Sequence, residues 1–163
     1  MIKQKLAKEI INLPAPLFTA KDVGGNTVSL AGLKGKVVIV DFWATWCGPC
    51  KKSFPAMQMA VDKYKNDENV KFLFIHTWEK EENPTVAAIN YLKENNYSFH
   101  LIMDLKDPVT KTNNIVTSYK VTGIPTKFII DGNGDIRYKI VGSAGNDEAV
   151  VEELSAMIES IRK

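Results

Sequence analysis

Residues 37–50, which read VVIVDFWATWCGPC, decide how this chain folds. Residues 37–43 are β-branched and almost continuously apolar, which predicts a central strand that is covered on both faces. A helix should begin directly afterwards, because Pro49 is favourable in a first turn, where its missing N–H costs nothing. The only cysteines, Cys47 and Cys50, therefore lie at a strand-to-helix junction. Two thiols at this spacing and place indicate a dithiol/disulfide pair.

Size and composition limit the class of protein. The 163 residues are enough for one domain with a sizeable core, and the net charge of +2 does not indicate nucleic acid or a membrane surface as a partner. No apolar run approaches the roughly 18 residues that a membrane-spanning helix needs. Charged residues in the segment 1–13 interrupt the apolar core of a signal peptide. We therefore expect either a cytoplasmic protein or a targeting segment outside this sequence.

The rest of the chain alternates strand-like and helix-like segments. The order strand, helix, strand over residues 37–77 predicts two parallel strands joined by a right-handed crossover. Residues 1–13 are expected to be a flexible or helical extension, and residues 19–30 a small hairpin. Further strands are expected over residues 70–77, 98–103, 127–130 and 135–141, and helices from the cysteines to about residue 66 and over 84–95, 108–119 and 147–161.

The position of the two cysteines predicts separate chemical roles. A free thiol titrates at about 8.5, and a helix N-terminus lowers that value to roughly 3.5–7.5 because its N–H groups stabilise the thiolate. Cys47 is therefore the expected nucleophile. Cys50 lies almost one turn further on and is expected to be less exposed. It can attack a mixed disulfide on Cys47 and release the reduced substrate.

Two further residues in this stretch are candidates for the site. Asp41 interrupts the apolar strand, and a buried carboxylate there would have a raised pKa and could accept the proton of Cys50. The alternative is that Asp41 ends the strand and is exposed. Trp46 precedes the nucleophile at a turn, where a large aromatic ring would shape the docking surface. His76 and His100 are expected to be surface or edge residues.

Other uses of a CxxC pair fit the sequence less well. A structural zinc site needs four ligands, and only His76 and His100 could join the cysteines, at unsuitable spacing. A purely structural disulfide would close too short a loop to restrain the chain. Peroxidase chemistry of the peroxiredoxin type needs Thr or Ser three residues before the reactive cysteine, where this chain has Ala44. A binding or adaptor module that keeps the pair without redox activity, or senses redox state through it, is a further alternative.

Residues 40–51 resemble the active-site segment of thioredoxin-fold oxidoreductases. Pro55 matches the proline of their active-site helix, residues 123–126 look like their cis-proline loop, and Gly142 matches a glycine that borders the active site. The resemblance covers nearly the whole chain. It implies one thioredoxin-like domain over residues 1–163, a three-layer α/β/α sandwich with a mixed central sheet.

Within that superfamily the chain is similar to the TlpA/ResA branch, which is related to the AhpC/TSA proteins. Residues 15–36 look like its N-terminal hairpin, and residues 84–99 like its central αβ insertion. Members are usually exported and reduce disulfides, some of them during cytochrome c maturation. Many have Glu where this chain has Ser53, and Asn where it has Asp41. These two departures favour a broader reductase that contributes to cell redox homeostasis.

The resemblance implies a set of site residues and partners. Substrate binding is expected at Trp46, Gly48, Pro49, Ile124 and Pro125, with the Ile124–Pro125 bond in cis. We expect a bacterial, periplasmic or cell-envelope monomer with antioxidant activity. It would act on protein disulfides or dithiols and take electrons from an upstream donor. No cofactor besides the Cys47–Cys50 disulfide, no metal and no nucleic acid is expected, and any membrane contact would come from a segment outside this sequence.

Overall fold

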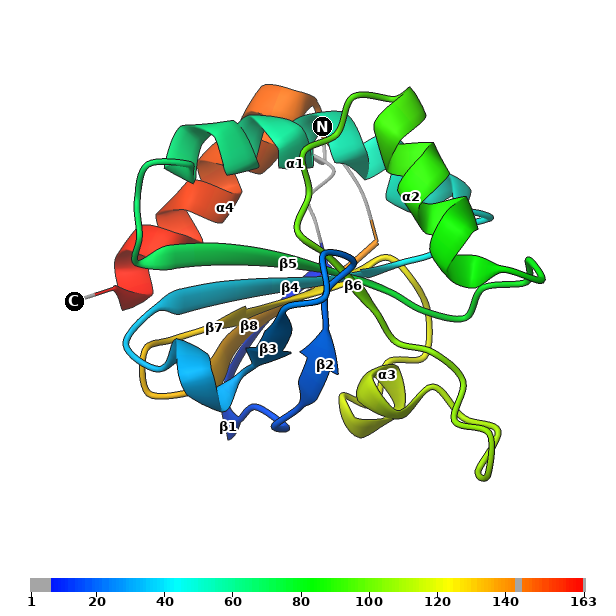
Figure 1. Ribbon diagram of the computed structural model, residues 1–163. Helices are drawn as coiled ribbons and strands as arrows, with labels where there is room; N and C mark the ends of the chain where they lie inside the picture. Colours follow the sequence, from blue (N-terminus) through cyan, green and yellow to red (C-terminus); the bar gives the residue numbers. More distant parts are fainter. Residues whose placement is uncertain (1–6, 143–144, 163) are drawn as a thin grey trace.

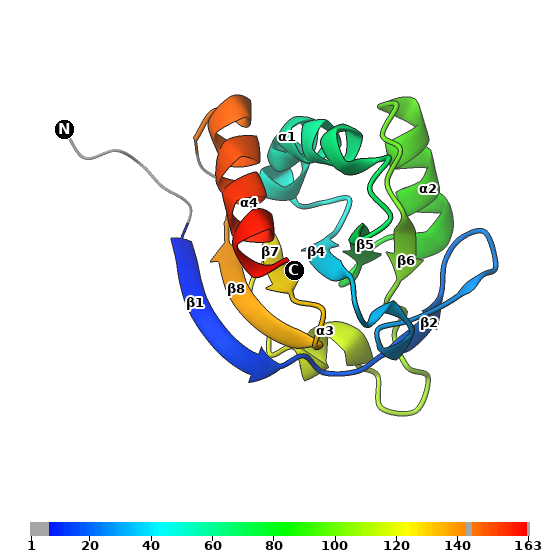
Figure 2. The same ribbon diagram turned by 90° about the vertical axis from the view of Figure 1, so that its left-hand side faces the viewer.

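The computed structural model describes residues 7–142 and 145–162. A six-stranded mixed sheet in the order β1-β8-β7-β4-β5-β6 forms the centre, and β2 and β3 make a separate hairpin. Helices α1, α2 and α4 cover one face, whereas α3 and the hairpin lie on the other (Figures 1 and 2). The elements are β1 (Ala7–Pro14), β2 (Thr19–Lys21), β3 (Thr27–Ser29), a 3-10 turn (Ala31–Leu33), β4 (Val37–Trp43), α1 (Gly48–Tyr64), β5 (Val70–His76), α2 (Pro84–Glu94), β6 (Leu101–Met103), α3 (Asn114–Ser118), β7 (Thr126–Ile130), β8 (Asp135–Val141) and α4 (Asp147–Ile161).

Strand β4 is the central element, as its sequence predicts. All seven of its residues are buried, and it pairs in parallel with β5 and antiparallel with β7. Its side chains alternate between two cores: Ile39 and Trp43 pack under α1, α2 and α4, whereas Val40 and Phe42 pack towards α3 and the hairpin. Asp41 therefore points to the helix-covered side that contains the cysteines.

The expectation of a flexible or helical extension over residues 1–13 is wrong for the part of it that the structure describes. Ala7–Pro14 form the edge strand β1, which pairs antiparallel with β8. Ile10 is 79% exposed, so the spacing of apolar residues here does not mark a buried helix face. Pairing with a neighbouring strand determines the conformation, and the local pattern does not reveal it. Residues 1–6 of the expected extension lie outside the described residues.

The helix expected over residues 108–119 is also much shorter than predicted. Asp107 closes a turn by accepting hydrogen bonds from the backbone N–H groups of Val109 and Thr110 at 2.8 and 3.0 Å. A β-bridge between Lys106 and Asn113 closes the same loop. Aspartate side chains compete with helix formation in this way, so only α3 remains helical. The other predicted elements are present, with end points that differ by up to three residues.

Candidate active site

The two cysteines lie where the sequence predicts, at the start of α1. Cys47 is the N-cap of the helix, and Pro49 lies in the first turn. The backbone N–H of Cys50 donates to Sγ of Cys47 at 3.2 Å, and the two sulfurs form a disulfide. When the pair is reduced, the same N–H and the helix N-terminus can stabilise a thiolate on Cys47.

The loop before β7 lies against Cys47. The carbonyl oxygen of Ile124 is 3.6 Å from Sγ of Cys47, and the Ile124–Pro125 peptide bond is cis, as the resemblance implies. A disulfide sulfur carries no hydrogen, so this approach is a contact in the oxidised form. In the dithiol form the Cys47 thiol can donate to that carbonyl. Cys47 is 2% exposed and Cys50 is fully buried, which agrees with the expected order of exposure.

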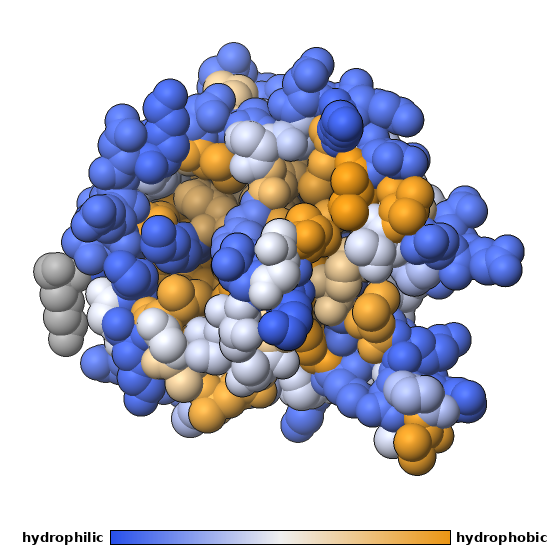
Figure 3. Space-filling view, viewed as in Figure 1, coloured by the Kyte–Doolittle hydropathy of each residue, from blue (hydrophilic) through white to orange (hydrophobic). Residues whose placement is uncertain are grey.

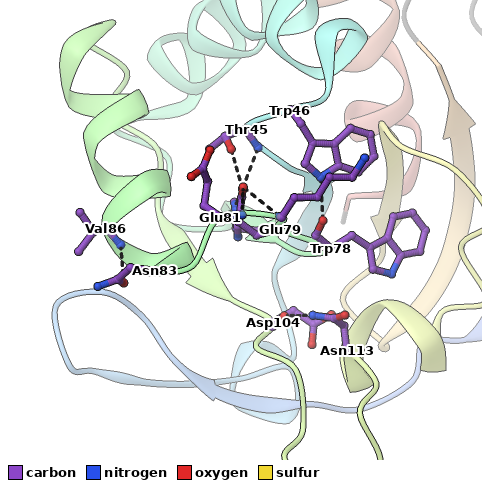
Figure 4. A network of polar contacts seen from close by, with 11 residues as sticks. Thr45, Trp46, Trp78, Glu79, Glu81, Asn83, Val86, Asp104 and Asn113 are labelled. Atoms are coloured by element: carbon purple, nitrogen blue, oxygen red, sulfur yellow. Dashed lines mark hydrogen bonds and ion pairs between the residues drawn. The ribbon is translucent and has the colours of Figure 1, made fainter.

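The surface beside the disulfide is formed by the turn that precedes α1 and by the first residues of the helix. Gly48 and Pro49 are exposed, and Trp46 is 44% exposed. The Trp46 ring has a fixed orientation because its Nε1–H donates to the carbonyl of Trp78 at 2.7 Å. The ammonium group of Lys80 lies 4.5 Å from the centre of the same ring. Figure 4 shows both indoles on the same side of this turn.

Asp41 is buried, and the alternative of an exposed strand end is wrong. The residue is 1% exposed, and among the described residues neither carboxylate oxygen has a hydrogen-bond partner. The Nζ of Lys127 on β7 lies 3.8 Å from Oδ2. Burial raises the pKa of the Asp41 carboxyl to about 6, against the opposing attraction of the Lys127 ammonium group. Asp41 can therefore gain and lose a proton near neutral pH.

A second buried acid, Glu79, holds the turn before the cysteines (Figure 4). Its Oε1 accepts hydrogen bonds from Oγ1 and N–H of Thr45, at 2.6 and 3.2 Å, and lies 2.7 Å from Nε2 of His76. Its Oε2 accepts from the N–H groups of Lys80 and Glu81, both at 3.1 Å. Burial alone would raise the pKa of Glu79, but these hydrogen bonds outweigh it and lower the pKa to about 2.

The two histidines differ from each other. The expectation that His76 lies at the surface is wrong, because it is 1% exposed and its ring packs edge-on against Trp43 at 5.0 Å. Burial lowers the pKa of His76, although Glu79 opposes that effect. The side chain of His100 is 43% exposed and lies 2.9 Å from Oδ2 of Asp22, as expected of an edge residue.

Ser53 occupies the position where the resemblance leads one to look for a glutamate. It is buried, and its hydroxyl donates to the carbonyl of Cys50 at 2.7 Å. The side chain is thus engaged with the backbone of its own helix, so it supplies no carboxylate beside the cysteines.

Two features that are typical of other classes of protein are absent from the described residues. Within residues 7–142 and 145–162, no group of three or more His, Cys, Asp or Glu side chains is arranged to hold a metal ion. No helix in this part of the chain combines the length and apolar character needed to cross a membrane.

Comparison with known proteins defines the class to which this fold and site belong. Residues 11–139 match the AhpC/TSA family, and the chain belongs to that family. Among curated proteins it is similar to the thiol-disulfide oxidoreductase ResA of Bacillus cereus (strain ZK / E33L), with 33% identity over 98% of this chain and 80% of the relative.

Solved structures confirm the fold. StoA of Bacillus subtilis is 28% identical with a TM-score of 0.68, and the match covers 85% of this chain and 96% of StoA. A thiol:disulfide interchange protein of the thioredoxin family from Chlorobium tepidum TLS is 26% identical with a TM-score of 0.72, over 94% and 98% of the two chains. The expectations of a thioredoxin-like α/β fold and of a TlpA/ResA-like protein are therefore confirmed.

Sequence reasoning placed Cys47, Cys50 and Asp41 but missed two of the groups around them. The sequence pattern places Lys127 within a strand and gives it no role, although a lysine within an apolar central strand is as unusual as Asp41. Glu79 carried no signal of its own, because it lies in a polar segment after β5. Only the fold shows that this segment passes directly beside Thr45.

Proposed function

We propose that this chain is a thiol-disulfide oxidoreductase that reduces disulfides in proteins. The observation that carries the proposal is the Cys47–Cys50 disulfide at the N-terminus of α1, with a backbone N–H on Sγ of Cys47. The similarity to ResA and StoA supports the same reaction class.

The reaction divides into two exchange steps. The Cys47 thiolate attacks a substrate disulfide, forms a mixed disulfide, and releases one substrate thiolate. Asp41 then accepts the proton of Cys50, and the Cys50 thiolate attacks Sγ of Cys47. This attack closes the Cys47–Cys50 disulfide and releases the second sulfur of the substrate as a thiolate. An external dithiol donor returns the pair to the reduced form.

Substrate docking is proposed at the surface around Cys47. Trp46, Gly48 and Pro49 form one side, and the backbone of Ile124 and Pro125 forms the other. Figure 3 shows hydrophobic side chains exposed over the end of the molecule where α2 and the segment before α3 lie. Exposed apolar residues there include Val86, Ile89, Leu105 and Val109. Such a surface suits segments of an incompletely folded polypeptide.

The site favours a general reductase over one dedicated to cytochrome c maturation. Ser53 supplies no carboxylate, and hydrogen bonds to both oxygens of Glu79 keep that acid ionised, so Asp41 is the proton acceptor we assign. By the family resemblance we place the protein in the periplasm or cell envelope, with the cytoplasm as the alternative. We expect it to act as a monomer.

Reduction of insulin by dithiothreitol tests the function. We expect the wild-type protein to accelerate insulin precipitation, Cys47→Ser to abolish the acceleration, and Cys50→Ser to accumulate a mixed disulfide with insulin. Activity that survives Cys47→Ser would overturn the mechanism. A redox titration with glutathione separates the reductase from a redox-inactive adaptor, which would show no reversible two-electron equilibrium. Rapid consumption of peroxide through Cys47 would instead support a peroxidase.

A further inference from the structure

Lys127 faces Asp41 across two central strands of the sheet. The two residues are direct partners in the antiparallel pairing of β4 with β7, so their side chains leave the sheet on the same side. That side is the one covered by α1, where Cys50 is buried. The side chains of Lys127 and Asp41 are 5% and 1% exposed, and Nζ lies 3.8 Å from Oδ2.

This pair differs from an ordinary structural ion pair. At 3.8 Å the ammonium group is too far away to donate a hydrogen bond, and neither Asp41 oxygen has another donor among the described residues. A buried carboxylate without hydrogen bonds is costly, and it remains free to accept a proton. Lys127 thus supplies charge to Asp41 without occupying its oxygens.

The titratable and charged groups around Asp41 come from three elements. Lys127 lies on β7 and Cys50 on α1. On β5 the residue paired with Asp41 is Phe74, and the nearest titratable residue of that strand is His76, which pairs in register with Trp43 and is bound to Glu79. Among the described residues, Lys127 is therefore the cation paired with Asp41 on the side of the sheet where Cys50 is buried.

We propose that Lys127 is a positioning residue for the resolving step. Its ammonium group keeps the buried layer that is formed by the side chains of Lys127, Asp41 and Cys50 neutral while a proton moves from Cys50 to Asp41. The inference rests on the function proposed above. Before the transfer the layer holds an ammonium, a carboxylate and a thiol. After it, the layer holds the ammonium, a carboxylic acid and a thiolate. The S–H bond breaks and an O–H bond forms, and the net charge of the three groups is zero in both states.

Without Lys127 the layer would carry one uncompensated negative charge before and after the transfer. An opposite charge at this distance holds the pKa of a carboxyl down by about 1–3 units. Removing it should therefore make Asp41 retain its proton to a higher pH. Because Asp41 accepts a proton only when it is ionised, the pH profile of the resolving step should move upward.

The test follows the resolving step directly. Reduced protein is mixed with Ellman's reagent in a stopped-flow instrument. The second release of thionitrobenzoate, which does not depend on reagent concentration, reports the attack of Cys50 on the Cys47 mixed disulfide. For Lys127→Met we expect the midpoint of its pH profile to rise by about 1–3 units, and the rate at neutral pH to fall between about twofold and a hundredfold. Lys127→Arg should restore the wild-type midpoint.

Two comparisons separate this role from a structural one. Lys139→Met removes a lysine from β8, where Lys139 pairs with Phe128 and so lies on the other face of the sheet, and it should leave the midpoint unchanged. In an Asp41→Asn background, Lys127→Met should have no further effect on the pH profile. An unchanged midpoint in Lys127→Met, or an equal shift in Lys139→Met, would overturn the proposal.

A measurement on the wild-type protein covers the case in which the Lys127 variants do not fold. In the oxidised protein, the ¹⁵N resonance of the Lys127 side chain should move as Asp41 titrates, with the midpoint that the ¹³C resonance of the Asp41 carboxyl reports. A Lys127 resonance that does not respond to Asp41 would contradict the proposal. Failure of the proposed function gives a different result, namely a wild-type protein that does not reduce insulin.

Discussion

The site contains two buried carboxylates, Asp41 and Glu79, and they are built in opposite ways. Glu79 receives hydrogen bonds on both oxygens, and its pKa falls to about 2. Asp41 receives none among the described residues, and its pKa rises to about 6. Each has a basic side chain nearby, Lys127 for Asp41 and His76 for Glu79, so the proximity of such a group does not distinguish them. Hydrogen bonding decides which acid keeps its charge and which can exchange a proton.

The difference assigns separate roles to the two acids. Glu79 stays ionised at neutral pH, because its pKa is lowered to about 2, and it ties Thr45, His76 and the backbone after Trp78 into one unit. Asp41 is the group whose charge can change near neutral pH, on the same side of the sheet as Cys50. The same chemical change, from carboxylate to amide, should therefore have opposite effects at the two positions.

The largest effect is expected for Glu79→Gln. An amide side chain has only one acceptor oxygen. In either orientation, its NH₂ group therefore faces N–H or O–H donors whose hydrogen bonds the Glu79 carboxylate now accepts. The loss should be about 3–5 kcal/mol in the free energy of unfolding, because at least two hydrogen bonds to the charged carboxylate are lost and each contributes about 1.5–3 kcal/mol. Urea unfolding of the oxidised protein at neutral pH measures it. Glu81→Gln, at an exposed neighbour, is the control, and a loss at Glu79 no larger than the control would contradict the comparison.

The next largest effect is the dependence of stability on pH that the titration of Asp41 causes. Its folded pKa of about 6 exceeds the ordinary 3.8, so the folded state holds the proton longer and loses stability as pH rises between those values. One pKa unit corresponds to about 1.4 kcal/mol, so the loss is at most about 3 kcal/mol. Relative to wild type, Asp41→Asn should therefore gain up to about 3 kcal/mol between pH 4 and pH 7.

Unfolding curves of both oxidised proteins at the two pH values measure this gain. The pH dependence of stability that Glu79 contributes has the opposite sign, because its folded pKa of about 2 lies below the ordinary 4.5. The stability that it contributes is present above pH 4.5 and is lost as pH falls towards 2. A constant difference between Asp41→Asn and wild type across this range would mean that Asp41 titrates normally in the folded protein.

Much of the fold follows from local sequence patterns, and the exceptions have physical causes. Strand β4 and helix α4 begin and end where their apolar periodicity predicts, because both elements bury a continuous face. Strand β1 and the loop before α3 could not be found this way. The first depends on pairing with β8, and the second on the side chain of Asp107. Both are interactions that periodicity does not encode.

The residues of the site also fall into those that the local sequence predicts and those that depend on strand pairing. Cys47, Cys50 and Asp41 lie within one continuous stretch, so their mutual arrangement follows from a strand that leads into a helix. Lys127 and Glu79 join them only through the order and register of β7, β4 and β5. A single sequence without a pairing register contains their residue types but not their neighbours.

The smallest of the three effects is expected for Thr45→Val, which asks how firmly Glu79 holds the turn before Cys47. The substitution keeps the shape of the side chain and the N–H donor but removes the hydroxyl that donates to Oε1 of Glu79 at 2.6 Å. Hydrogen bonds to charged groups contribute about 1.5–3 kcal/mol. Oε1 keeps two other partners, so the loss in the free energy of unfolding should be about 1–2 kcal/mol. Thr122→Val, at an exposed position, is the control and should change stability by less than about 0.5 kcal/mol.

Thr45 is two residues before Cys47, and its variant also shows whether the two acids act independently. If Glu79 only supports the turn, Thr45→Val should lower stability and leave the pH midpoint of the resolving step unchanged, because Asp41 and Lys127 lie within strands β4 and β7, outside that turn. A shift of that midpoint as large as the one expected for Lys127→Met would show that the two carboxylates are coupled. The division between a structural acid and a proton-accepting acid would then have to be abandoned.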